Sequence, residues 1–267
     1  MPGSGERPRY TSSTHLSVSR LMSENLNDLV TTLGITRDKA MKVPSGGSPL
    51  YHSFEVDPRD FLEQAEQDFE AGGKSALLNS ITNSKRAIHC QVDQALKSLG
   101  IDTGQMHLPQ KIELLTSMGF VVPRILKKVN RARNLLEHEY QTPDEATVEE
   151  ALDLALMFIE TTNRRLDIFE DEFYIGNEDE KISTFKFERQ LEFSMHRPRR
   201  TEFDHPVFVA RGRTNRTDNE KIVGKVVLKP EEKTFRDIVR LVNARNQKSQ
   251  VQKALDSLFD TLGLEEV

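Results

Sequence analysis

The chain has a single cysteine, no long apolar run and no apolar segment near its start. Because Cys90 is the only cysteine, an internal disulfide and a cysteine-based zinc site are both excluded. The longest apolar stretch, Leu154 to Ile159, is far shorter than the roughly 20 residues that a membrane-spanning helix needs. The first residues also lack the apolar core of a secretory signal. These absences favour a cytoplasmic protein with no membrane contact, held together by packing alone.

The chain also has little net charge. Its 267 residues include 37 Lys and Arg against 42 Asp and Glu, which gives a formal charge of −5. This average is too small to indicate a nucleic acid or any other charged partner. Hydrophobic residues make up 36% of the chain, which is enough for a globular core. The composition therefore favours one or two folded domains.

Composition divides the chain into three segments. Residues 1–57 are rich in Ser, Thr, Gly and Pro and predict a largely disordered arm, in which only His15 to Leu33 has a helical apolar spacing. Residues 58–173 predict an antiparallel bundle of four to five helices, and residues 174–267 predict a small α+β module. The expected fold class is therefore mainly α.

The expected helices of the bundle share an apolar spacing of helical period and the usual start and stop residues, such as Asp57 before Pro58. They run from Pro58 to the Gly72-Gly73 pair, from Lys74 to Leu99, from Pro109 to Met118, from Pro123 to about Glu139, and from Asp144 to about Phe173.

The C-terminal segment changes to a period of two. Between Thr184 and Met195 the odd positions are apolar except for Arg189 and the even positions are polar, which predicts a half-buried strand. Residues 206–210 and 222–228 predict two more strands, and two amphipathic helices are expected over 234–246 and 249–262. The module should therefore contain about three antiparallel strands and two helices.

Charge is distributed unevenly along the bundle. Residues 123–138 carry five Lys and Arg against one acid, whereas residues 141–180 carry thirteen acids against two arginines. A basic segment is often no more than a solvated face, but it can also contact a polyanion.

Arg133 lies near the middle of the apolar stripe of this basic helix, roughly 20° from its centre on a regular helix. Burying an arginine is costly unless an anion or a carboxylate meets it. Two explanations remain open. The guanidinium could pair with Glu137 or with an acid on the 144–173 helix, or it could line a pocket that holds a phosphate.

Asn134 and His138 are neighbours at i and i+4 on another side of the same helix. Regular geometry separates His138 from Arg133 by roughly 140°. If both act on one phosphate, either the helix unwinds between them or a second copy of the chain supplies half of the site.

The segment from Arg133 to Tyr140, RNLLEHEY, resembles the R-x4-6-H motif of the HEPN superfamily in the R-N-x-x-x-H-x-Y form of its toxins. The resemblance covers roughly residues 58–173, where the expected helices also suit a HEPN-like bundle. It implies a metal-independent endoribonuclease that needs no cofactor, forms a homodimer, and acts as a toxin or antiviral effector. The scattered histidines likewise give no metal-ligand pattern.

The resemblance also implies roles for the residues of the motif. His138 would act as the general base or acid while the ribose 2′-OH attacks, Arg133 would stabilise charge on the phosphate, and Asn134 would orient the phosphate or His138. Tyr140 matches a tyrosine that is modified in toxins paired with a nucleotidyltransferase. Its place on the apolar stripe favours packing instead.

Further basic residues are candidates for RNA contact, with surface or protein contacts as the alternative reading of the C-terminal group. They are Lys127, Lys128, Arg131, Arg197, Arg199, Arg200, Arg211 and Arg213. The expected partners are RNA, a second copy of the chain and an antitoxin or regulatory protein. The alternative function is a HEPN-like bundle that does not cut and serves as a nucleic-acid-binding or protein-interaction subunit.

Overall fold

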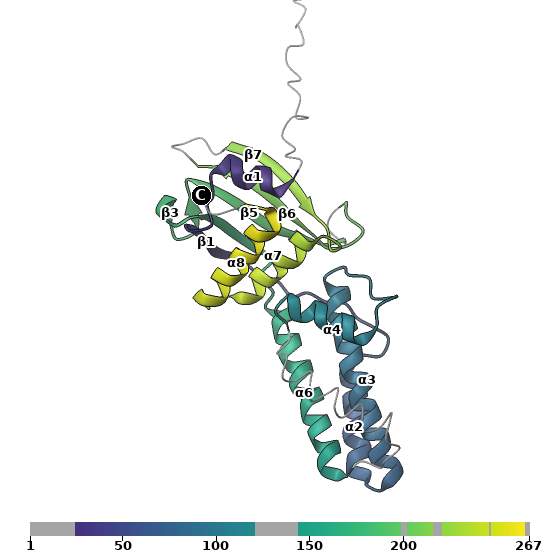
Figure 1. The fold of residues 1–267 in the computed structure, drawn as a ribbon. Helices are drawn as coiled ribbons and strands as arrows, with labels where there is room; N and C mark the ends of the chain where they lie inside the picture. Colours follow the sequence, from purple (N-terminus) through teal and green to yellow (C-terminus); the bar gives the residue numbers. More distant parts are fainter. Residues whose placement is uncertain (1–24, 121–143, 199–201, 216–220, 246, 265–267) are drawn as a thin grey trace, which may run out of the picture.

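The computed structural model describes residues 25–120, 144–198, 202–215, 221–245 and 247–264 (Figure 1). The fold is α+β: a helical bundle is followed by a five-stranded antiparallel sheet and two C-terminal helices. The expected bundle and the expected C-terminal strands and helices are confirmed, but the fold class is α+β and not mainly α. The expected helix over 123–139, which includes the motif, lies outside the described residues.

The bundle contains four described helices. They are α2 (Pro58–Ala71), α3 (Lys74–Ser98), α4 (Leu108–Ser117) and α6 (Glu145–Asp167). Capping fixes where two of them begin: Asp60 Oδ2 accepts the N–H of Asp57 at 2.7 Å, and Asp144 Oδ1 accepts the N–H of Thr147 at 2.8 Å. Small and branched residues of α3 and α6 are fully buried, which lets these two long helices pack closely. None of the described helices combines the length and the apolar character needed to cross a membrane.

The sheet is entirely antiparallel, in the order β1-β2-β5-β6-β7. Its strands are β1 (Ala40–Gly46), β2 (Glu172–Asn177), β5 (Arg189–His196), β6 (Val207–Thr214) and β7 (Lys221–Leu228). A small hairpin of β3 (Lys181–Ser183) and β4 (Lys186–Phe187) sits between β2 and β5 in the sequence. The expected alternation is confirmed along β5, where Leu191, Phe193 and Met195 are buried, but Phe185 before it is exposed.

Three helices lie on the same side of this sheet: α1 (Leu26–Leu33), α7 (Lys233–Ala244) and α8 (Lys248–Leu262) (Figure 1). The ring of Phe235 on α7 lies 5.5 Å from that of Phe208 on β6. Leu29 and Leu33 of α1 come close to Gly212, where an added Cβ would lie 3.2 and 3.4 Å from them. The inward-facing residues of the sheet therefore pack against helices. The opposite face carries polar residues of β2 and β5 but also valines, such as Val209 on β6 and Val227 on β7 beside Ser194.

The prediction of a largely disordered arm over residues 1–57 is wrong for the described part of it. Residues 26–33 form α1, and residues 40–46 form β1, an edge strand paired along its length with β2. The helix expected over 15–33 therefore begins at Leu26 in the described chain, and residues 1–24 lie outside it. Because β1 finds its partner beyond the bundle, its local composition gives little sign of the pairing.

Two further expectations need correction. The helix expected to reach about Phe173 ends at Asp167, because Phe173 and Ile175 belong to β2 and point into the core of the sheet. The sheet has five strands instead of about three, since β1 and β2 were not anticipated. The α+β module therefore draws on residues both before and after the bundle.

Gly176 on β2 provides a test of the packing. The Phe187 ring occupies the space where a side chain at residue 176 would begin. We expect Gly176→Ala to lower the free energy of unfolding by about 1–3 kcal/mol, because it overpacks a buried aromatic contact. Gly104→Ala is the control: its side chain would meet only the Asp102 carboxylate, at 3.4 Å, and the expected change is within about 0.5 kcal/mol. Denaturant unfolding of both variants measures the difference, and equal stability would contradict the packing described here.

Candidate functional site

All the residues predicted for the catalytic site lie outside the described residues: Arg133, Asn134, His138 and the accessory Tyr140. So do five of the predicted RNA contacts, which are Lys127, Lys128, Arg131, Arg199 and Arg200. The other predicted RNA contacts, Arg197, Arg211 and Arg213, are described. The described chain has concave regions in the bundle and on the sheet.

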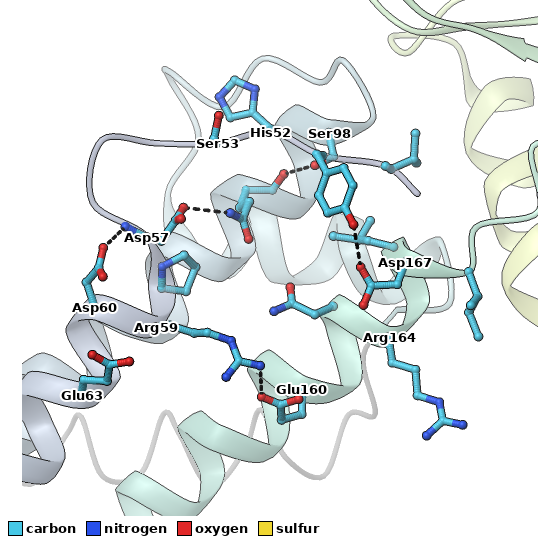
Figure 2. A pocket seen from close by; sticks show the side chains of 17 residues that line it. His52, Ser53, Asp57, Arg59, Asp60, Glu63, Ser98, Glu160, Arg164 and Asp167 are labelled. Carbon is cyan, nitrogen blue, oxygen red and sulfur yellow. Dashed lines mark hydrogen bonds and ion pairs between the residues drawn. The ribbon is translucent and has the colours of Figure 1, made fainter. Parts of the chain in front are cut away.

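The bundle pocket lies where the segment 50–57 crosses α2, α3 and α6, and its volume is about 1020 Å³ (Figure 2). Five acids line it against two arginines, Arg59 and Arg164. This surplus of carboxylates disfavours a phosphate, so the bundle pocket by itself is not suited to RNA.

Several polar groups of the bundle pocket connect different elements of the fold (Figure 2). Arg59 on α2 pairs with Glu160 on α6. Gln94 Nε2 on α3 donates to Asp57 Oδ1 at 3.2 Å, and the Tyr51 hydroxyl lies 3.5 Å from Asp167 Oδ1. These contacts connect the segment before α2 to α3 and α6, which indicates a structural role for the pocket.

His52 is the histidine of the bundle pocket. Partial burial lowers its pKa, and the nearby Lys97 charge lowers it further, so the imidazole is neutral near pH 7. Within the described residues, no group of three or more His, Cys, Asp or Glu side chains is placed to hold a metal ion.

The sheet pocket, as we call the second concave region, has a volume of about 550 Å³ and is bordered by the loop of Gly46, Gly47 and Ser48. Its floor comes from the polar face of the sheet, opposite the three helices. The lining residues on that face are Glu172, Glu192, Ser194, His196 and Arg211. A pocket of this size can hold a small ligand or part of a polymer.

One row of paired residues crosses the sheet beside this pocket. Tyr174 on β2 pairs with Glu192 on β5, Glu192 pairs with Arg211 on β6, and Arg211 pairs with Lys225 on β7. Directly paired residues of antiparallel strands share a face, so these four side chains lie on one side of the sheet. Arg213 also reaches Glu192 with its Nε. The Glu192 carboxylate therefore pairs with the guanidinium groups of both Arg211 and Arg213.

Ser194 lies at the centre of the sheet pocket. Arg211 Nη1 donates to Ser194 Oγ at 3.1 Å, and the same oxygen lies 3.2 Å from His196 Nε2. Partial burial lowers the pKa of His196, the charges of Arg211 and Lys225 lower it further, and Glu202 opposes them. The imidazole is therefore neutral near pH 7, and its Nε2 can accept the proton of the Ser194 hydroxyl.

Arg197 fixes the rim of the sheet pocket. Its guanidinium donates to the carbonyl oxygens of Pro49 at 2.6 Å and Ser48 at 3.0 Å, and to Asp171 Oδ2 at 2.9 Å. These bonds hold the loop after β1 against the start of β2. The described contacts of Arg197 are thus within the chain, and its contact with RNA remains a prediction.

Sequence reasoning missed three residues of this region: Ser194, His196 and Lys225. The alternation that predicted β5 also assigned its even positions to the polar face, so continuing it by one step would have placed His196 beside Ser194. Lys225 had no comparable signal, because its position opposite Arg211 depends on the register of β7.

Comparisons of the chain with protein-family models, with curated proteins and with solved structures gave no match.

Proposed function

We propose that the chain is a metal-independent endoribonuclease of HEPN type. The observation that carries this proposal is the segment RNLLEHEY at residues 133–140, which lies in the sequence between α4 and α6 of a helical bundle. The described helices support the proposal because they form a bundle around the long α3, with α2, α4 and α6 packed against it.

In the proposed reaction the 2′-OH of a ribose attacks the adjacent phosphate. His138 exchanges a proton with the 2′-oxygen or the leaving 5′-oxygen, and Arg133 stabilises the charge that develops on the phosphate. Asn134 orients the phosphate or the imidazole. The nucleophile belongs to the RNA, so the reaction requires no cofactor. Its products are a 2′,3′-cyclic phosphate and a 5′-hydroxyl.

The proposed enzyme is a homodimer in which Arg133 and His138 of different copies meet. The angle of roughly 140° between them on a regular helix supports this arrangement. The described surface of the bundle also has two exposed apolar side chains, Leu156 and Met157 on α6, which suit contact with a second copy.

In our proposal the nuclease acts as a toxin or antiviral effector, so its cleavage activity must be inhibited when it is not needed. The acidic segment 141–180, much of which forms α6 and β2, offers charge complementary to the basic motif segment. An antitoxin or another regulatory protein is the second possible source of restraint. Cleavage that is insensitive to salt would argue against electrostatic restraint.

The test is to incubate the purified full chain with structured and unstructured RNAs in buffer containing EDTA. We expect cleavage at the same rate with and without EDTA, and products that carry 2′,3′-cyclic phosphate ends. Intact RNA throughout, together with measurable RNA binding, would instead support the alternative of a non-catalytic binding subunit.

A further inference from the structure

We propose that the sheet pocket and the face of the sheet opposite α1, α7 and α8 bind single-stranded RNA. In this proposal Arg211 and Lys225 contact a phosphate and Tyr174 contacts a base. The proposal rests on the proposed function only for the choice of RNA as the polyanion. The binding surface itself is separate from the motif segment and belongs to the α+β module.

Arg211 has hydrogen-bond donors that its neighbours do not use. A guanidinium has five N–H donors, and the contacts of Arg211 to Ser194 and Glu192 both involve Nη1. The contact to Glu192 Oε1 is long, at 3.5 Å, because Glu192 is shared with Arg213. Arg211 is therefore only partly neutralised, and its planar fork suits the oxygens of a phosphate.

A second cation lies next to Arg211. Lys225 is its direct partner on β7, and within the described chain Lys225 makes no hydrogen bond or ion pair. The sheet pocket itself is lined by three acids, but Asp171 is paired with Arg197 and Glu192 with arginines of β6. The positive charge that remains is therefore concentrated toward β6 and β7, away from Glu172 on β2.

Aromatic rings lie on both sides of the charged residues. Tyr174 is half-buried in the same row as Arg211, two strands away and next to Glu192, and its hydroxyl is 3.3 Å from Ser45 Oγ. The rings of His196 and Phe203 meet edge to face, 6.1 Å apart, near the other end of β5. Unpaired bases stack on such rings, whereas the bases of duplex RNA are hidden within the helix.

Charge and polarity favour RNA over a protein partner on this face. Protein interfaces have an apolar centre with few charges. Among the described residues of the five-stranded sheet, Ile222 is the only large apolar side chain that is exposed, and it lies at the start of the edge strand β7. The row that crosses the face from Tyr174 to Lys225 is instead charged and aromatic, and Val209 in the next row is buried and offers no apolar surface to a partner.

A bound phosphate changes the environment of His196. The groups that face its ring are Ser194 on β5, Arg211 on β6, Lys225 on β7 and Glu202 with Phe203 on the following loop. A phosphate between the two cations offsets their effect and favours the protonated imidazole, which then becomes a further donor to the phosphate. Binding should therefore strengthen as the pH falls below neutrality.

The test measures fluorescence anisotropy of a labelled 2′-O-methyl oligonucleotide, which lacks the attacking hydroxyl and cannot be cut by the proposed reaction. Arg211→Gln and Lys225→Gln in the full chain should each weaken binding of the single strand by about three- to tenfold. Each should also reduce the slope of log affinity against log salt concentration by about one, the contribution of one phosphate contact. Lys248→Gln on α8, at the covered side of the sheet, removes the same charge and should change neither quantity.

The outcomes separate this inference from the proposed function. If Arg211→Gln does not fold, Lys225→Gln alone tests the inference, because this substitution removes a charge without breaking a hydrogen bond or ion pair of the described chain. Equal affinity of both variants and the parent chain overturns the inference even if RNA is cleaved. The inference is also overturned if the chain binds duplex RNA as tightly as single-stranded RNA. It is overturned as well if the chain binds a protein instead of RNA and this binding depends on Lys225. Weakened binding in a chain that never cuts RNA supports the inference and leaves the proposed nuclease activity wrong.

Discussion

Replacing His138 by alanine should reduce RNA cleavage by about 100- to 10,000-fold, the range that positioned acid–base groups contribute. Arg133→Ala should have an effect of about 100- to 1,000-fold, because it removes the charge that meets the phosphate in the transition state. Single-turnover cleavage of a labelled RNA measures both losses. If the chain is toxic when expressed, the same substitutions should abolish the toxicity.

Arg86→Ala provides the matched control for these variants. Arg86 is an exposed residue of α3 whose Nη1 contacts Asn83 at 3.4 Å, so its loss removes a positive charge from the bundle without a buried contact. Circular dichroism should show the same helical content in all three variants. Full cleavage by His138→Ala would exclude the motif as the catalytic site, and equal loss in Arg86→Ala would assign the effect to charge alone.

Mixing the two inactive variants should restore cleavage. If Arg133 of one copy acts with His138 of the other, a dimer of Arg133→Ala with His138→Ala retains one intact site of two. Random exchange of subunits makes half of the dimers mixed, so we expect about a quarter of the parent activity. The measurement is cleavage after the two proteins have been mixed and allowed to exchange subunits.

The mixing experiment has a clear contrary result. If each site lies within one copy, every chain in the mixture carries one of the two defects, so no mixture would recover activity. Light scattering supplies the control, since a strictly monomeric chain cannot form the shared site. Recovery without dimer formation would point to contamination by active protein.

Local patterns predicted the elements whose signals are complete within a short segment. The Asp57-Pro58 start, the Gly72-Gly73 interruption and the alternation before Met195 each reflect the conformation of a few neighbouring residues, and the structure has α2, α3 and β5 there. β1 was missed because Pro44 and the glycines after it are typical of loops. Its pairing with β2 depends on residues that lie beyond the bundle.

The candidate sites show the same limit. The motif at 133–140 was visible because its residues are close in sequence, whereas the sheet pocket joins β2, β5 and β6 through their register. A shift of one residue in that register would turn Arg211 to the opposite face, against the helices. Spacing in the sequence therefore could not indicate that Arg211 and Lys225 are neighbours, nor that Arg197 bonds to the loop after β1.

The pairing of β1 with β2 also sets an order of folding. Gly46 pairs with Glu172, so the chain leaves the sheet and returns to it at adjacent points, with the whole bundle between them. During synthesis β1 emerges first and cannot pair until the bundle and β2 have followed. A bundle that has already folded shortens the loop that must close and so reduces the entropy lost on pairing. The rim of the sheet pocket, which combines Gly46 to Ser48 with Asp171 and Glu172, can therefore be completed only after the bundle has been synthesised.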